Sequence, residues 1–247
     1  MSKKAIIIGS GISGLSSACF LAKEGWNVTV LEKNKTIGGR ARQFSEQGFV
    51  FDMGPSWYWM PDVFESFYQK FGYTTSDFYE LKRLDPSYRV YWSDQSYSDI
   101  PANMESLEAL FESLEPGSGL KLRSFLADAK YKYDVGMKDL VYKPSLKITE
   151  FIDLRLLKGL FSMDLTNSFS SYIRRYFTHP KLLSLLEFPV LFLGAMPKDT
   201  PALYSLMNYA DMELGTWYPM GGMYKFIEAF EKIARSLGVE IISDAEV

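Results

Sequence analysis

Near the N-terminus, three glycines and one acidic residue stand at a spacing suited to the recognition of phosphate and sugar groups. The glycines are Gly9, Gly11 and Gly14, and Glu32 follows about one helix and one strand later. In this pattern the first glycine permits a tight turn, the second lets the backbone approach a diphosphate, and the third allows a helix to pack closely on a strand. A carboxylate at the position of Glu32 accepts hydrogen bonds from ribose hydroxyls and repels a 2′-phosphate. These residues predict a site for the adenosine and diphosphate groups of a dinucleotide.

The residues around the glycines predict the elements that hold this site. The apolar run at 5–8 is typical of a strand buried on both faces of a parallel sheet. Apolar residues at helical spacing follow Gly14, Gly25 ends that helix, and 27–32 reads as a second strand. The N–H groups at the start of the helix favour the phosphate charge. The cofactor-binding residues expected here are Gly9, Ser10, Gly11, Ile12, Ser13, Gly14, Glu32 and Lys33.

The glycine pattern does not separate NAD from FAD, but the next twenty or so residues add two features. Gly38 and Gly39 expose backbone N–H groups, and Arg40 offers a bidentate fork for phosphate oxygens. Arg42 either assists Arg40 or is a surface charge. The stretch FVFDMGP alternates like a strand and ends in Gly54-Pro55, where the backbone can approach a flat ring.

Four stretches together resemble the phytoene desaturase family of FAD-dependent, flavin amine-oxidase-like oxidoreductases, which also holds carotenoid isomerases. They are GSGISGL, LEKN…GGRA, F.FDMGPSW and GTWYPMGGMYKFIEAFEKIARSLGVEI. The resemblance covers the whole chain and is most specific at its two ends. It implies FAD as the cofactor and an α/β fold. The Rossmann-like FAD-binding domain (GR2-type) would occupy 1–85 and 217–247, with an inserted, largely helical α+β substrate domain at 86–216.

The resemblance also implies roles for single residues. Gly39 and Arg40 would wrap the FAD pyrophosphate, and Val247, which ends the last strand, would contact the adenine. Asp153 and Arg155 fall where the family carries an Asp–Arg pair proposed for acid–base work. Arg155 is the better match, and an exposed helical ion pair is the alternative. The remaining expected site residues are Gly54 and Pro55 beside the flavin, and Trp57 and Trp217 lining the substrate path, where simple packing is the alternative.

The middle of the chain changes its periodicity. A hairpin is expected around Asp94-Gln95, and helices over 103–114, 119–142, 148–161, 168–177, 180–192 and 200–212. These helices are rich in Phe, Leu and Met, which suits either a packed core, an apolar tunnel or a face that enters a bilayer surface. In the last case the cations Lys147, Arg155, Lys158, Arg174 and Arg175 would contact anionic headgroups. Because no run approaches the roughly 20 apolar residues of a membrane span, peripheral association is the expectation.

Composition excludes several other classes of function. The formal net charge is -3 and the basic residues are scattered, so no nucleic-acid partner is expected. The chain has a single cysteine, Cys19, which excludes an internal disulfide. Because it also has a single histidine, His179, no metal site is expected. A cytoplasmic location follows from this cysteine usage.

The expected reaction is carotenoid desaturation, in which a polyene C–C bond loses a hydride to the flavin and a proton to a base or solvent. Three alternatives stay open: carotenoid isomerisation, an amine-oxidase-like reaction on a polar substrate, and a truncated, non-catalytic FAD- or lipid-binding product. The last arises because the family's chains are about twice as long and carry a C-terminal flavin segment that this sequence lacks. Weak FAD retention and little turnover are expected of the 247 residues alone.

Overall fold

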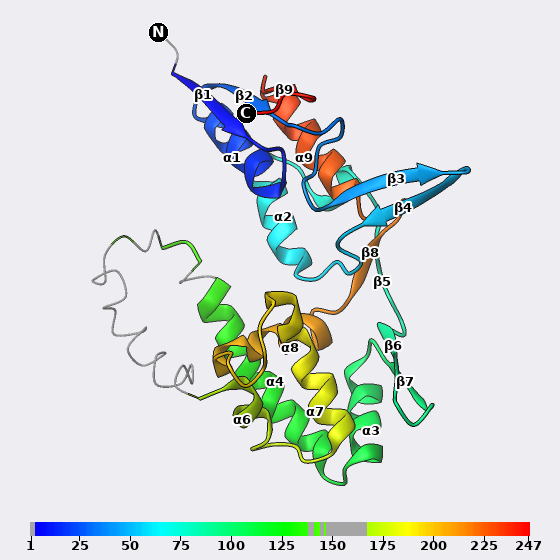
Figure 1. Cartoon of the computed structure of the whole chain (residues 1–247). Coiled ribbons are helices and arrows are strands. Elements are labelled where there is room, and N and C mark those ends of the chain that lie inside the picture. The colour runs from blue at the N-terminus through cyan, green and yellow to red at the C-terminus, as the bar shows by residue number, and fades with distance from the viewer. Residues whose placement is uncertain (1–2, 138–140, 144–145, 147–166) are drawn as a thin grey trace. The chain divides into compact units, whose positions relative to one another are not determined.

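The computed structural model describes residues 3–137, 141–143, 146 and 167–247. The chain divides into two units, one formed by Met1–Arg83 with Trp217–Val247 and the other by Leu84–Thr216 (Figure 1). The first is called the nucleotide unit and the second the helical unit. Asp153 and Arg155, the expected acid–base pair, lie outside the described residues.

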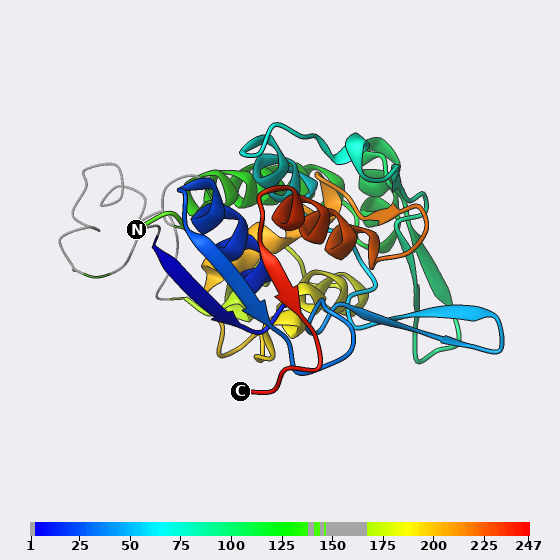
Figure 2. The ribbon, with the colours of Figure 1, turned by 90° about the horizontal axis from the view of Figure 1, so that it is seen from above.

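A three-stranded parallel sheet organises the nucleotide unit. Its order is β1 (Lys4–Ile8), β2 (Asn27–Leu31) and β9 (Glu240–Ile242), with Ile7 opposite Val30 and Val30 opposite Ile241. Helix α1 (Ile12–Lys23) is the crossover from β1 to β2, and α9 (Lys225–Ser236) leads into β9. The two helices lie side by side over one face of the sheet (Figure 2). The described residues therefore build the βαβ half of a dinucleotide-binding fold.

The other face of this sheet corrects one sequence expectation. The run at 5–8 forms β1 as expected, but Ile6 and Ile8 are 69% and 68% exposed, so the strand is not buried on both faces. The covered face is the one that carries Ile7, which packs with the core under α1 and α9. Within the nucleotide unit, no described element packs on the opposite face, which carries Ile6 and Ile8.

Three further pairs of segments complete the nucleotide unit. Strands β3 (Arg42–Glu46) and β4 (Phe49–Met53) form an antiparallel hairpin that extends away from the sheet (Figure 2). Strands β5 (Leu81–Arg83) and β8 (Trp217–Pro219) pair antiparallel where the chain leaves and re-enters the unit. Between β4 and β5 lie α2 (Pro61–Gln69) and the short 3₁₀ helix η1 (Thr75–Asp77). An aromatic core joins α2 to α9, with the Phe67 and Phe230 rings stacked at 4.2 Å.

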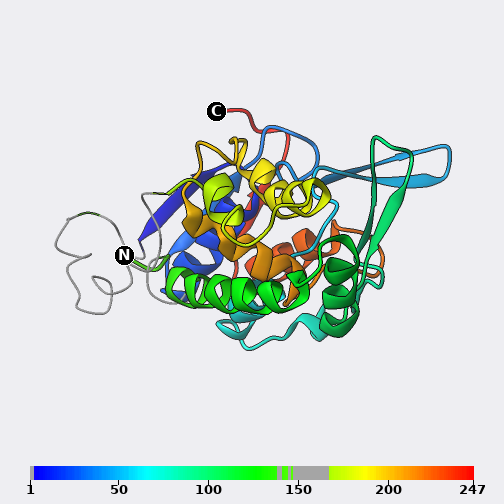
Figure 3. The same ribbon diagram turned by 90° about the horizontal axis from the view of Figure 1, so that it is seen from below.

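The helical unit begins with the antiparallel hairpin β6 (Tyr88–Tyr91) and β7 (Tyr97–Ile100), as the turn at Asp94-Gln95 predicts. Helices α3 (Met104–Leu114) and α4 (Ser118–Val135) pack together, and α8 (Leu206–Met212) lies along α4 (Figure 3). The remaining elements are α6 (Phe169–Ile173), α7 (Pro180–Glu187), and the 3₁₀ helices η4 (Phe188–Leu193) and η5 (Ala202–Ser205). In the described part of the chain, no helix is long and apolar enough to cross a membrane.

Among the described residues of the helical unit, a lysine and an aspartate are buried with the apolar side chains of the core. Lys132 is fully buried, pairs with Asp128 at 2.9 Å, and lies 3.8 Å from the centre of the Tyr172 ring. Asp211 is 1% exposed and accepts hydrogen bonds from the Tyr88 hydroxyl at 2.6 Å and the Thr216 hydroxyl at 3.2 Å. Burial raises the pKa of Asp211 from 3.8 to about 7, against the opposing effect of these two bonds.

Candidate functional site

The turn between β1 and α1 depends on its glycines. Gly9 has φ +95°, a backbone conformation that favours glycine, and its N–H donates to the Leu31 carbonyl at 2.7 Å. A Cβ on Gly14 would stand 2.0 Å from the Gly9 carbonyl oxygen, so the first turn of α1 packs against the end of β1 only because residue 14 is glycine. These contacts are the close helix-on-strand packing that the motif predicts.

A second glycine turn meets the first. A Cβ built on Gly39 would lie 3.0 Å from the Cα of Gly11, whereas a Cβ on Gly11 meets nothing nearer than the Cα of Gly39 at 3.9 Å. The Gly38 N–H donates to the Ser10 carbonyl at 2.9 Å and fixes the two turns together. The backbones of both turns are therefore bare of side chains where they meet, which leaves a cradle that a larger residue would fill.

Glu32 stands at the end of β2 and is 3% exposed. Its Oε2 accepts from the Ser10 N–H at 2.9 Å and the Ser10 hydroxyl at 2.6 Å, and its Oε1 accepts from the Asn34 N–H at 3.0 Å and the Asn34 side-chain amide at 2.6 Å. Burial alone would raise its pKa, but these bonds outweigh burial and hold the pKa at about 2. Glu32 is therefore ionised at neutral pH.

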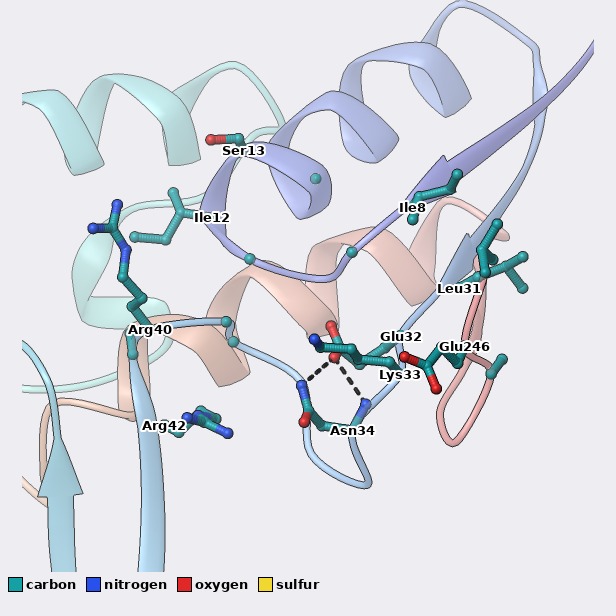
Figure 4. A pocket seen from close by; sticks show the side chains of 18 of the residues that line it. Ile8, Ile12, Ser13, Leu31, Glu32, Lys33, Asn34, Arg40, Arg42 and Glu246 are labelled. Carbon is teal, nitrogen blue, oxygen red and sulfur yellow. Dashed lines mark hydrogen bonds between the residues drawn. The ribbon is translucent and has the colours of Figure 1, made fainter.

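This bonding changes how Glu32 can meet a ribose. A carboxylate has about four lone-pair positions, and all four are used: Ser10 donates twice to Oε2 and Asn34 donates twice to Oε1. A ribose diol must therefore replace the two side-chain donors, the Ser10 hydroxyl and the Asn34 amide, while the two backbone donors keep the carboxylate in place. Figure 4 shows Asn34 beside Glu32 with both bonds drawn.

Two arginines follow the second glycine turn. Arg40 extends toward Ile12 at the start of α1, and Arg42, the first residue of β3, lies farther along the same segment (Figure 4). The Nε of Arg42 is buried and has no hydrogen-bond partner. Among the described residues, neither arginine forms a salt bridge, so both cations remain available to an anion.

These segments enclose a pocket of about 1140 Å³, which is large for a small-molecule site. Of the residues expected to bind the cofactor, it is lined by Gly9, Gly11, Ile12, Ser13, Gly14, Glu32, Lys33, Gly39, Arg40, Pro55 and Val247. Sequence reasoning did not select Asn34, Ala245 or Glu246, which also line it. Asn34 had a local signal, because it stands two residues after Glu32 in a turn where an amide side chain can bond back. Ala245 and Glu246 reach the pocket only through the pairing of β9 with β2.

Four other expected residues lie outside the lining. Ser10 is fully buried behind Glu32, and Gly54 adjoins Pro55, with no room for a Cβ because the Arg40 carbonyl oxygen would be 2.1 Å away. Trp57 packs against Trp59, with ring centres 5.4 Å apart. Trp217 lies in β8, where its N–H donates to the Tyr58 carbonyl at 3.1 Å.

One carboxylate, Asp52, joins two segments of the nucleotide unit that lie far apart in the sequence. Asp52 Oδ2 accepts from the Met223 N–H at 2.9 Å and from the Tyr218 hydroxyl at 3.2 Å. Asp52 belongs to the FDMGP stretch and the other two residues to the WYPMGGM stretch, so these distant segments meet through it. Gly222 has φ +108°, and a Cβ there would lie 3.3 Å from Asp52 Oδ1.

The chain belongs to the flavin-containing amine oxidoreductase family, whose sequence model matches residues 12–247. It is 39% identical over 242 residues to a carotenoid 3,4-desaturase of Haloarcula japonica, covering 98% of this chain and 49% of that protein. It is 33% identical over 244 residues to a 4,4'-diapophytoene desaturase of Staphylococcus aureus strain Newman, covering 99% of this chain and 49% of that protein. The chain thus spans about half the length of these curated relatives.

A solved structure of a putrescine oxidase variant has the same fold, with a TM-score of 0.59 at 16% identity, covering 100% of this chain and 51% of that chain. Family membership supports FAD as the cofactor. The site fits the adenosine and diphosphate end of FAD on three observations: the bare glycine cradle, the ionised Glu32 and the unpartnered buried Nε of Arg42.

Proposed function

We propose that the protein is an FAD-dependent oxidoreductase of the carotenoid desaturase type, which converts a C–C single bond next to a polyene into a double bond. The observation that carries the proposal is the 39% identity to a carotenoid 3,4-desaturase across nearly the whole chain. The reaction removes one hydride and one proton from adjacent carbons. FAD, when bound, supplies the two-electron acceptor.

The nucleotide unit has the task of holding the cofactor. The β1–α1 turn and Gly39 offer backbone N–H groups to the diphosphate, Arg40 offers a cation, and Glu32 accepts the ribose hydroxyls. Val247 lines the same pocket and would contact the adenine. We expect Asp153 and Arg155 to serve proton transfer, and Trp57 and Trp217 to line the path of the polyene. Residues 1–85 and 217–247 are thus proposed as the FAD-binding domain.

Residues 86–216 are proposed as the substrate domain, which receives an apolar chain from a bilayer. A long polyene does not cross water readily, because each CH₂ favours the apolar phase by about 0.8 kcal/mol. The helical unit exposes a short apolar segment that suits contact with lipid: Leu191, Phe192, Leu193 and Met196 are 56%, 57%, 43% and 56% exposed. Lys198 follows closely and is exposed. We therefore propose peripheral association with a membrane surface on the cytoplasmic side.

The membrane proposal is tested by co-sedimentation with liposomes that contain anionic lipid. Phe192→Asp should reduce pelleting, because it places a charge in the apolar segment. Leu120→Asp is the matched control, since Leu120 is 77% exposed in the same unit but lies outside this segment. Equal pelleting of all three proteins would argue against lipid contact by the 191–196 segment.

The reaction is tested by supplying FAD and a carotenoid in liposomes to the purified chain and following the pigment by chromatography and absorbance. Desaturation lengthens the conjugated system, so absorbance moves to longer wavelength and the product has lost two hydrogens. A product of unchanged mass and altered geometry would indicate isomerisation instead. No pigment conversion, with FAD bound, would leave a non-catalytic FAD-binding protein.

A further inference from the structure

Arg42 is a cation whose role the sequence leaves open between phosphate binding and surface charge. The structure places it in the wall of the pocket, together with Arg40. Its Nε is buried without a hydrogen-bond partner, and in the described part of the chain no carboxylate pairs with it. A guanidinium that served only solubility would keep its donors in water. A buried donor without an acceptor is unfavourable, so this arrangement favours the arrival of an acceptor.

The charges around the pocket indicate what that acceptor is. Glu32 and Glu246 line the same pocket and are acidic, yet Glu32 is fully engaged by Ser10 and Asn34 rather than by either arginine. The start of α1, Gly39, Arg40 and Arg42 therefore form a local positive region at the other end of the pocket (Figure 4). A diphosphate carries a negative charge on each phosphate group. The cation Lys33 also lines the pocket but lies beside Glu32 (Figure 4), so without Arg42 only Arg40 supplies a full positive charge at this end.

We propose that Arg42 binds the diphosphate of the dinucleotide together with Arg40, so that the pocket carries one guanidinium for each phosphate group. This inference rests on the proposed FAD site. Arg42 begins β3 two residues after Arg40, which stands in the preceding turn, and both side chains line the same pocket. The planar guanidinium suits phosphate oxygens, and a small reorientation toward them gives Nε the acceptor that it lacks.

The test is calorimetric titration with ADP and with adenosine, which differ only in the diphosphate. Arg42→Gln should weaken ADP binding by about 10- to 100-fold, the effect of losing a charge-assisted hydrogen bond, and leave adenosine binding within about twofold. Arg42→Lys should bind ADP with intermediate affinity, because it keeps the charge and loses the fork. Arg235→Gln is the matched control, since Arg235 pairs with Glu231 at 2.8 Å on α9 and does not line the pocket.

The outcomes separate this inference from the cofactor assignment. Wild-type affinity for ADP in Arg42→Gln would overturn the role of Arg42 while leaving the nucleotide site intact. Equal losses for ADP and adenosine would also overturn it, because they would indicate a structural effect on the whole pocket. If Arg42→Gln does not fold, Arg42→Lys is the deciding variant. An affinity for ADP equal to that of wild type would then overturn the proposal that the Arg42 guanidinium binds the diphosphate. A wild-type chain that binds neither ligand overturns both proposals.

Discussion

Glu32 provides a prediction that links the stability of the nucleotide unit to its cofactor site. Its carboxylate receives four hydrogen bonds from Ser10 and Asn34, which join the β1–α1 turn to the end of β2. Glu32→Gln keeps the shape but puts an NH₂ group against N–H donors. The pKa of Glu32 falls from 4.5 to about 2 on folding, which corresponds to about 3 kcal/mol at about 1.4 kcal/mol per pKa unit.

The sign of the pH dependence follows from the direction of this shift. The folded pKa is depressed, so the stabilisation is fully present above pH 4.5 and is lost as pH falls toward about 2. At pH 7 the variant should be less stable than wild type by about 3 kcal/mol. The difference should shrink as pH falls through about 2 and nearly vanish only below that value, because the folded wild-type carboxyl is just half protonated at its own pKa.

Urea unfolding followed by tryptophan fluorescence measures this effect, because four of the five tryptophans lie in the nucleotide unit. The assay is repeated across the acidic range for wild type and Glu32→Gln. Glu240→Gln serves as the control, since Glu240 begins β9 with an exposed side chain that accepts only from the Thr29 hydroxyl at 3.2 Å. A stability deficit in Glu32→Gln that stays constant with pH would contradict this prediction, because the loss would then not come from the ionised carboxylate.

Three further predictions concern other parts of the chain. Gly11→Val should fold, because a Cβ there meets only the Gly39 Cα at 3.9 Å. Its side chain should fill the glycine cradle and abolish FAD retention, so a variant that purifies with the yellow colour of bound flavin would contradict this. Asp211→Asn should make the free energy of unfolding less dependent on pH. Burial raises the pKa of Asp211 to about 7, so the wild-type protein loses up to about 4 kcal/mol of stability as pH rises from about 4 to 7. A variant that keeps the wild-type pH dependence would exclude Asp211 as its cause. Asp52→Ala should speed hydrogen exchange of the Met223 amide by about 5- to 10-fold through loss of a hydrogen bond, and unchanged exchange would show that the bond does not hold that turn.

Local sequence signals predicted several elements in each of the two units. The apolar run at 5–8 gave β1, the helical spacing after Gly14 gave α1, and the turn at Asp94-Gln95 gave the β6–β7 hairpin. Proline limited the helix predictions: the helix expected over 180–192 divides into α7 and η4, because Pro189 lacks an N–H and its ring is incompatible with a continuing α-helix.

The features that sequence reasoning missed depend on tertiary contacts. The exposed face of β1 reflects what packs on the sheet, which the apolar residues of the strand itself do not encode. The engagement of Glu32 by Ser10 spans 22 residues, and the burial of Arg42 Nε depends on the path of β3 beside the glycine turns. No local pattern marks Asp211 as buried, because the Tyr88 hydroxyl that bonds it lies 123 residues away in the sequence.

The FAD site is tested most directly by an equilibrium titration of the purified chain with FAD, followed by flavin fluorescence, with FMN and NADP as competitors. The chain should bind FAD saturably, and ADP should displace it. FMN should compete poorly because it lacks adenosine, and NADP should compete poorly because its 2′-phosphate meets the ionised Glu32. Absence of saturable FAD binding, or equal competition by FMN, would contradict the assignment of this pocket to the adenosine and diphosphate groups of FAD.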